Sequence, residues 1–237
     1  MNPFAALFGR SAAAFAANLR RGDVLAIRRA RRVFITSTFL NLALYFSPLS
    51  PDPAETRKFP CTISWTIRKG LAKWVNVLVW SAGWWQVLKT FARRGDLTAR
   101  VFSAQMYTVG LAVCFFAPVG QGPLRDKIHT VGAGLYFVYH CILFEYMRTA
   151  TVYRAGFYAS FYGFLHCLRN IRKVEADYGF LSESDWYIGT AEERRNTARM
   201  NEKTAAKLWW QKLGQMIFEN TMFLSFTVGM TSGLRGL

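Results

Sequence analysis

Residues 33–49 read VFITSTFLNLALYFSPL, seventeen residues without a charged side chain. A helix that faces water carries charged or polar side chains on one face at every turn, so this run predicts a helix surrounded by apolar material. A bilayer core about 30 Å thick needs about 20 helical residues, and lysines or arginines at the ends extend a shorter run by reaching to the headgroups. The run therefore predicts a membrane-spanning helix.

Five further uncharged or nearly uncharged stretches, none longer than 20 residues, follow along the chain. They cover residues 74–88, 101–119, 128–147, 155–168 and 213–231. Together with the first stretch they predict an all-α fold, a polytopic membrane bundle of about six transmembrane helices. The alternative is a soluble all-helical protein with short core helices, which the mean hydropathy of +0.11 allows.

The sequence predicts four regions. A basic targeting or interfacial segment (1–32) precedes a five-span membrane region (33–168), a hydrophilic helical insert (169–212) and the last span with the C-terminus (213–237). Prolines at 48 and 118 predict helix ends, since proline lacks the amide proton and restricts its predecessor. A short polar connection at 148–154 predicts an antiparallel hairpin between the fourth and fifth stretches.

Positive charge is spread over every loop. Thirty Lys and Arg residues against fourteen Asp and Glu give a net charge of +16. The basic residues do not form a single patch. An anionic lipid surface, or acidic neighbouring subunits, is therefore expected to balance the positive charge, rather than nucleic acid. The candidate lipid-headgroup contacts are the basic residues near the ends of the stretches: Arg28, Arg29, Arg31, Arg32, Lys73, Lys89, Arg93, Arg94, Arg154 and Arg169. Bound phospholipid such as cardiolipin is expected.

The first 32 residues hold seven arginines and one acid, Asp23, among many alanines and scattered aromatic residues. This composition is typical of a mitochondrial presequence, and an amphipathic helix lying in the membrane interface is the competing interpretation. Whether the segment is cleaved stays open. It does not resemble a secretory signal peptide, because the first long apolar run begins only at residue 33.

Small residues recur every four positions in two of the stretches. In hydrocarbon such ridges let two backbones approach closely, so they predict helix-packing faces. The residues are Ala155, Ala159 and Gly163 in the fifth stretch, and Ser225, Gly229 and Gly233 in the sixth.

Few residues have side chains that could take part in catalysis, ligand binding or proton transfer. The possible buried ionisable groups are His140, Glu145, His166 and Glu219, and an ionisable group inside a membrane implies a partner or a proton role. Glu145 lies near Arg148, and Glu219 lies close enough to Lys212 to stay hydrated. His129 and His140 share a helical face, a weak basis for a haem site. No phosphate-binding loop, paired-carboxylate site or nucleophile motif is present, so no catalytic, metal-binding or cofactor-binding residue is predicted.

Residues 126–137, DKIHTVGAGLYF, resemble the His-x-x-Gly-Ala-x-x-x-Phe opening of one helix in the six-span DRAM superfamily, which includes damage-regulated autophagy modulators and GPI-anchor maturation factors. Glu219 with Phe223 and Phe226 is also similar to a glutamate and aromatic pattern of that family. The arginine-rich N-terminus and the charged insert depart from it. The resemblance implies a membrane protein without catalytic residues to carry over.

Two functions remain, neither of them enzymatic. The first is a structural, lipid-contacting accessory subunit of a mitochondrial inner-membrane complex, such as a respiratory complex or the ATP synthase, with other membrane subunits as partners. The alternative is a free-standing, DRAM-like protein of the endomembrane system that acts in lipid handling or trafficking. An ion or proton carrier that uses Glu145 and Glu219 is a weaker third possibility, since no internal repeat is evident.

Overall fold

The computed structural model describes residues 3–50, 59–119, 122–147, 149–178, 195 and 198–236; for 3–22, 114–115, 123 and 233–236 it describes only the helical backbone. Every regular element in these residues is a helix, which confirms the all-α prediction. The helices are α1 (Pro3–Phe46), α2 (Ile63–Thr66), α3 (Gly70–Arg94), α4 (Leu97–Phe116), α5 (Pro123–Tyr146), α6 (Thr151–Asp177) and α9 (Glu202–Gly236).

Two helices end where the sequence predicts. α1 ends at Phe46, just before Pro48, and α4 ends at Phe116, just before Pro118. A proline in the next turn would lack the N–H that continues the helix, and its ring would clash with the preceding backbone. Both helix ends are therefore determined locally.

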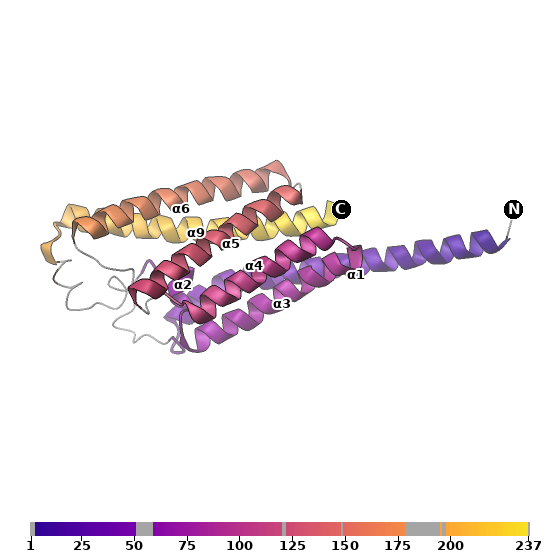
Figure 1. Ribbon diagram of the computed structural model, residues 1–237, viewed down its shortest axis with the longest axis horizontal. Coiled ribbons are helices and arrows are strands. Elements are labelled where there is room, and N and C mark those ends of the chain that lie inside the picture. Colours follow the sequence, from indigo (N-terminus) through magenta and orange to yellow (C-terminus); the bar gives the residue numbers. More distant parts are fainter. Residues whose placement is uncertain are drawn as a thin grey trace.

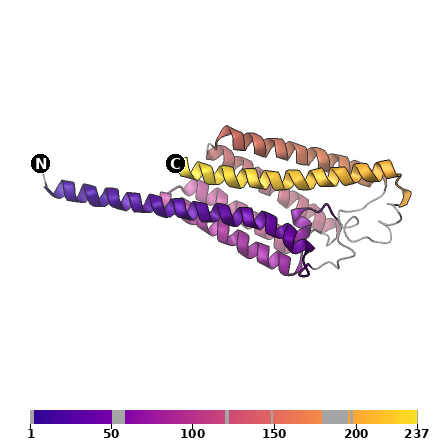
Figure 2. The same cartoon turned by 180° about the vertical axis from the view of Figure 1, so that it is seen from behind.

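The long helices lie roughly along one axis in an elongated bundle, and the N-terminal part of α1 projects beyond it (Figures 1 and 2). α6 packs closely against α9, α1 packs against α3 and α9, and α4 packs against α3 and α5. α5 and α6 are consecutive, yet their backbones make almost no close contact. The two helices of the predicted hairpin meet instead through side chains, such as Phe137 with Phe161 and Glu145 with Arg154.

The helices run across the predicted region boundaries. α1 joins the basic segment to the first apolar stretch without a break, α6 continues past residue 168 to Asp177, and α9 begins inside the predicted insert at Glu202. Residues 179–194 of the insert lie outside the described residues. Helix propagation adds a hydrogen bond per residue, so a change of polarity does not end a helix where no breaker is present.

Glycines allow the close approach of α6 and α9. A Cβ added at Gly163 would lie 2.7 Å from an aromatic ring of α9, and one at Gly156 would lie 3.1 Å from Ser225 Oγ. A Cβ at Gly229 would meet three side chains at 2.5 to 2.9 Å. Ser225 and Gly229 belong to the ridge predicted on α9, whose third member, Gly233, has surroundings outside the described residues.

The packing face of α6 differs from the predicted one. Gly163 lies at the contact, but Ala155 and Ala159 are exposed. Gly156 takes their place, because it lies seven residues before Gly163 and about two turns of helix bring the two onto one face. A glycine also permits a closer approach than an alanine would.

Polar side chains inside the bundle bond mainly to their own helices. The side chains of Asn76, Thr90, Ser160 and Thr231 each donate to the backbone carbonyl four residues earlier, at 2.7 to 3.2 Å. Other bonds join two helices: Ser37 Oγ on α1 donates to Asn76 Oδ1 on α3 at 3.1 Å, and the Tyr107 hydroxyl on α4 donates to Ser81 Oγ on α3 at 2.8 Å. These hydroxyl and amide groups are therefore satisfied without water.

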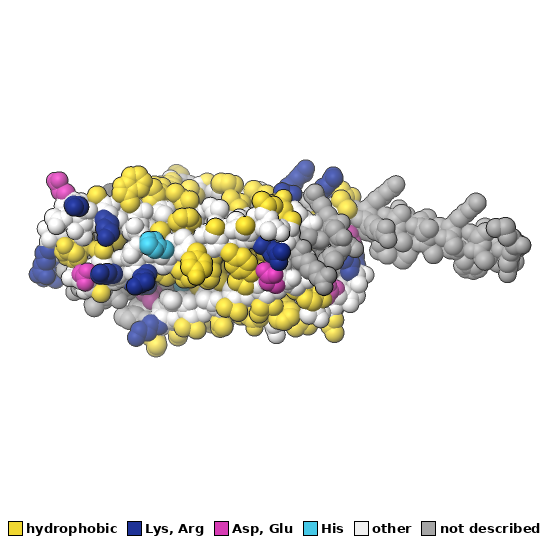
Figure 3. All heavy atoms as spheres, turned by 90° about the horizontal axis from the view of Figure 1, so that it is seen from above, with side chains coloured by type: hydrophobic (Ala, Val, Ile, Leu, Met, Phe, Trp, Pro, Cys, Tyr) yellow, Lys and Arg dark blue, Asp and Glu magenta, His cyan; other side chains and the backbone are white. Residues whose placement is uncertain are grey.

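The outer faces carry large apolar side chains. Figure 3 shows Lys and Arg toward both ends of one face and hydrophobic side chains between them. Side chains more than 60% exposed include Leu78, Trp85, Phe116, Val131, Val152 and Tyr162. Within the described part of the chain, none of the helices is long and apolar enough to cross a membrane. The composition of these helices therefore does not support the prediction of several transmembrane helices.

Replacing Gly229 with leucine should lower the free energy of unfolding by about 1–3 kcal/mol, because the new side chain would overlap three packed neighbours. Ala159→Leu is the matched control: residue 159 is exposed, and its change should stay within about 0.5 kcal/mol. Thermal unfolding followed by circular dichroism measures both, at about 2–4 °C per kcal/mol for a chain of this size. Equal midpoints for the two variants would contradict the close contact.

Candidate functional site

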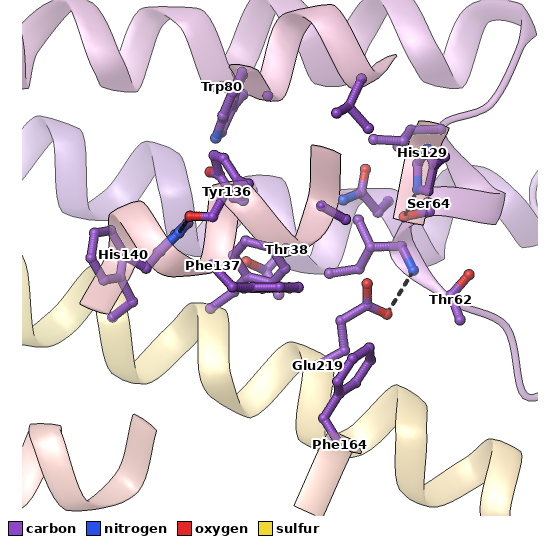
Figure 4. Close-up of a pocket in the computed structure, with 18 of the residues that line it drawn as sticks. Thr38, Thr62, Ser64, Trp80, His129, Tyr136, Phe137, His140, Phe164 and Glu219 are labelled. Carbon is purple, nitrogen blue, oxygen red and sulfur yellow. Dashed lines mark hydrogen bonds between the residues drawn. The ribbon is translucent and has the colours of Figure 1, made fainter. Parts of the chain in front are cut away.

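A cavity with a volume of about 380 Å³ lies inside the bundle, and α1 to α6 and α9 all contribute to its lining. Small-molecule sites span about 300–1,000 Å³, so the cavity lies at the lower end of that range. Polar residues gather around α2 at one end, including Thr62, Ser64 and His129, and aromatic residues dominate the other end (Figure 4). The cavity thus has a polar end and an apolar end.

Glu219 connects α9 to the start of α2 at the polar end. Its Oε2 accepts a hydrogen bond from the Ile63 N–H at 3.0 Å, and the residue is only 6% exposed. Burial, together with the charge of Glu219, raises the pKa of the neighbouring Cys61 thiol to about 12. The carboxylate is therefore a structural anchor and a fixed acceptor in the cavity wall.

His129 has both ring nitrogens bonded. Nδ1 lies 2.8 Å from the Ala117 carbonyl oxygen, and Nε2 lies 2.9 Å from Ser64 Oγ. Because a carbonyl only accepts, Nδ1 donates to it, and Nε2 is bonded to the Ser64 hydroxyl. With both ring nitrogens engaged within the protein, neither is left to ligate haem iron.

His140 lies at the aromatic end and is 1% exposed. Its Nδ1 donates to the Tyr136 carbonyl at 2.7 Å, and its ring centroid lies 4.0 Å from that of Phe226 and 4.3 Å from that of Tyr136. The aromatic rings that surround His140 make it part of the packing around the cavity.

Glu145 and His166, predicted as possible buried groups, are exposed. Glu145 accepts hydrogen bonds from Arg154 Nη1 at 2.8 Å and from the Tyr158 hydroxyl at 2.9 Å. They lie on outward faces of α5 and α6, where neither lines the cavity. Of the four predicted ionisable groups, the structure brings only His140 and Glu219 to the cavity.

A buried ion pair that the sequence did not predict joins α6 to α9. Lys212 Nζ lies 2.9 Å from Glu175 Oε1, and the two side chains are 2% and 5% exposed. Arg172 Nη1 approaches the other oxygen of the same carboxylate at 3.3 Å. Lys212 therefore pairs with Glu175. The expectation that Glu219 would stay hydrated is wrong, because the residue is only 6% exposed. Lys212 and Glu175 are 37 residues apart, so only the tertiary fold pairs them.

The predicted headgroup contacts divide by their surroundings. Arg93 and Arg94 each approach Asp23 at 3.4 Å, and Arg154 pairs with Glu145. Three carboxylate-bound arginines are thus already engaged by protein. Among the other predicted headgroup contacts, four are exposed and three are half-buried. The exposed ones are Arg28, Arg29, Arg32 and Arg169, and the half-buried ones are Arg31, Lys73 and Lys89.

Within the described residues, no three His, Cys, Asp or Glu side chains come together in a way that could hold a metal ion. No family model matches the chain, and neither a curated protein nor a solved structure matches it. The resemblance to the DRAM superfamily therefore stays a prediction. Its residues do converge: those that line the cavity are His129, Ala133, Phe137, Glu219, Phe223 and Phe226.

Lys212→Met should destabilise the protein by about 3–5 kcal/mol, because it leaves the Glu175 carboxylate buried beside only a half-exposed arginine. Adding Glu175→Leu should recover most of this loss, since two apolar residues remove both desolvation costs. Arg172→Met is the control and should cost less than about 1 kcal/mol. Chemical denaturation of the wild-type chain and the three variants measures the effects, and a double variant no more stable than Lys212→Met would contradict the pairing.

Proposed function

We propose that this chain is a non-catalytic, structural subunit of a mitochondrial inner-membrane assembly, such as a respiratory complex or the ATP synthase, with its helices embedded in the bilayer. The observation that carries the proposal is the distribution of polarity. Large apolar side chains cover the outer faces, while Ser37, Asn76, Ser160 and Thr231 are buried between helices.

This distribution suits a lipid surrounding. Monomers in water rarely expose contiguous apolar patches larger than a few hundred Å², whereas lipid-facing helices do so over most of their length. A helix with a polar inward face and an apolar outward face has a modest average hydropathy. Lys and Arg near the helix ends lower the average further while they extend toward the headgroups.

The basic residues near the bundle end support contact with anionic lipid. Arg28, Arg31 and Arg32 line a surface hollow on α1, beside the start of the first apolar stretch. Cardiolipin, a doubly charged phospholipid, suits such a cluster, because basic residues near a membrane surface attract anionic headgroups by about 1 kcal/mol each. The arginine-rich segment 1–32 supports a mitochondrial location.

The second candidate is a free-standing, DRAM-like endomembrane protein in lipid handling or trafficking. The observation that favours it is the position of the motif residues. His129, Phe137, Glu219 and Phe223 come from two distant parts of the sequence, yet all four line the same cavity. A purely structural subunit does not require that convergence.

Alkaline carbonate extraction of cell membranes should leave the chain in the membrane pellet, because an apolar exterior does not partition into water. Native electrophoresis of mildly solubilised mitochondria should then show the chain comigrating with a large respiratory or ATP synthase complex. Release into the carbonate supernatant would overturn the membrane proposal. Retention in endomembranes, with none in mitochondria, would favour the second candidate over the first.

A further inference from the structure

The wall of the cavity suits a hydrocarbon chain. The cavity has a volume of about 380 Å³, and aromatic residues such as Trp80, Phe137 and Phe164 form much of its wall (Figure 4). An apolar cavity of about 150 Å³ already stays free of water and takes up a small apolar molecule such as benzene. A larger space with walls of this kind is therefore expected to hold hydrocarbon.

The cavity opens sideways between α5 and α6. Of the described residues that line it, the exposed ones are Thr130 and Gly134 on α5 and Leu165 and Arg172 on α6. The backbones of these two helices make almost no close contact. Because the exposed part of the lining lies on these two helices, a chain on the outer surface of the bundle can enter the cavity between them.

Two arginines of α6 border the opening. Arg172 lines the cavity, and its side chain is 48% exposed. Arg169, also exposed, lies four residues after Leu165 and three before Arg172, and side chains three or four residues apart are neighbours on a helix surface. The α6 side of the opening therefore carries positive charge.

This positive charge is only partly balanced by the protein. The Glu175 carboxylate lies 3.3 Å from Arg172 Nη1, but it also lies 2.9 Å from the buried Lys212 Nζ, so one negative charge faces two positive ones. The charged residues deeper in the described wall, Arg68 and Glu219, are 5% and 6% exposed and have opposite signs. The interior thus has no net charge, whereas the exposed α6 side of the opening is positive.

We propose that the cavity holds one acyl chain of an anionic phospholipid, whose phosphate lies outside the opening against Arg169 and Arg172. A guanidinium donates hydrogen bonds to phosphate oxygens, often two at once. The headgroup stays where water reaches it, so no ion has to be buried. This site deepens the lipid contact proposed above, and entry from a bilayer rests on that proposed function, whereas the cavity itself does not.

Photo-crosslinking of the purified full-length chain in dodecyl maltoside micelles tests the proposal. The probe is phosphatidylglycerol with a diazirine in one acyl chain, and phosphatidylcholine with the same chain is its zwitterionic counterpart. Tandem mass spectrometry should place saturable labelling by phosphatidylglycerol on inward residues such as Phe137 and Phe164. Labelling that never saturates, or that is confined to outward residues such as Val138 and Tyr162, would overturn the proposal.

Gly134→Leu narrows the opening from the α5 side. A Cβ at Gly134 would have no atom within 4 Å, and leucine favours the helix over glycine, so the unfolding temperature should not fall. Labelling of the inward residues should fall at least fivefold. Ala159→Leu, the same enlargement at an exposed site outside the cavity lining, should leave it unchanged. Full inward labelling in a folded Gly134→Leu variant would contradict entry between α5 and α6.

The double variant Arg169→Gln, Arg172→Gln tests the headgroup contact. In the unchanged chain phosphatidylglycerol should label at least fivefold more strongly than phosphatidylcholine, the effect of about one basic residue on an anionic headgroup. The double variant should lose this preference and keep its labelling by phosphatidylcholine, since Lys212 still pairs with Glu175. Arg100→Gln, which removes an exposed arginine of α4 outside the lining, should keep the preference. Equal labelling of the unchanged chain by the two lipids, or a preference that survives in the double variant, would overturn the proposal.

These experiments separate the cavity from the proposed function, because they use micelles. Retention of the chain in the carbonate pellet, without saturable inward labelling, contradicts the acyl-chain site alone. Saturable inward labelling of a chain that carbonate releases contradicts the membrane location alone and supports the site.

Discussion

The rest of the structure depends on the close packing of α6 against α9. Glycines at positions 156 and 163 bring the two helices together, and Gly229 on α9 lies against Phe144 of α5 and Tyr153 of α6. α5 and α6, which the chain joins directly, make almost no close backbone contact and meet through side chains such as Phe137 and Phe161. These aromatic rings also line the cavity, together with residues of α1, α2, α3, α4 and α9.

Much of the secondary structure could be predicted from the sequence, because the signals are local. Pro48 and Pro118 mark helix ends through their own rings. The partners of the helices could not be predicted in the same way. Spacings of four (Ala155, Ala159) and of seven (Gly156 to Gly163) are both compatible with one helical face, and only the shape of α9 selects between them.

Part of the candidate site could be predicted from the sequence. Glu219 stood out as a carboxylate in an apolar stretch, and the structure places it in the cavity wall. Asn41 and Arg172, which also line the cavity, were missed, because which side of a helix faces the cavity depends on residues far away in the chain. One signal was available for Asn41: it is the single amide in the uncharged run 33–49, and a lone polar group in such a run needs a reason.

The internal hydroxyls have a consequence for how the sequence can change. Because Thr90, Ser160 and Thr231 bond to carbonyls of their own helices, no neighbouring helix has to match them. Alanine or valine at such places keeps the interlocking surfaces intact, whereas any side chain at Gly229 does not. During evolution the buried hydroxyl residues can therefore be replaced, whereas the glycines at helix contacts cannot. Relatives of this chain should keep the shapes of the helix surfaces more strictly than the polarity of the buried positions.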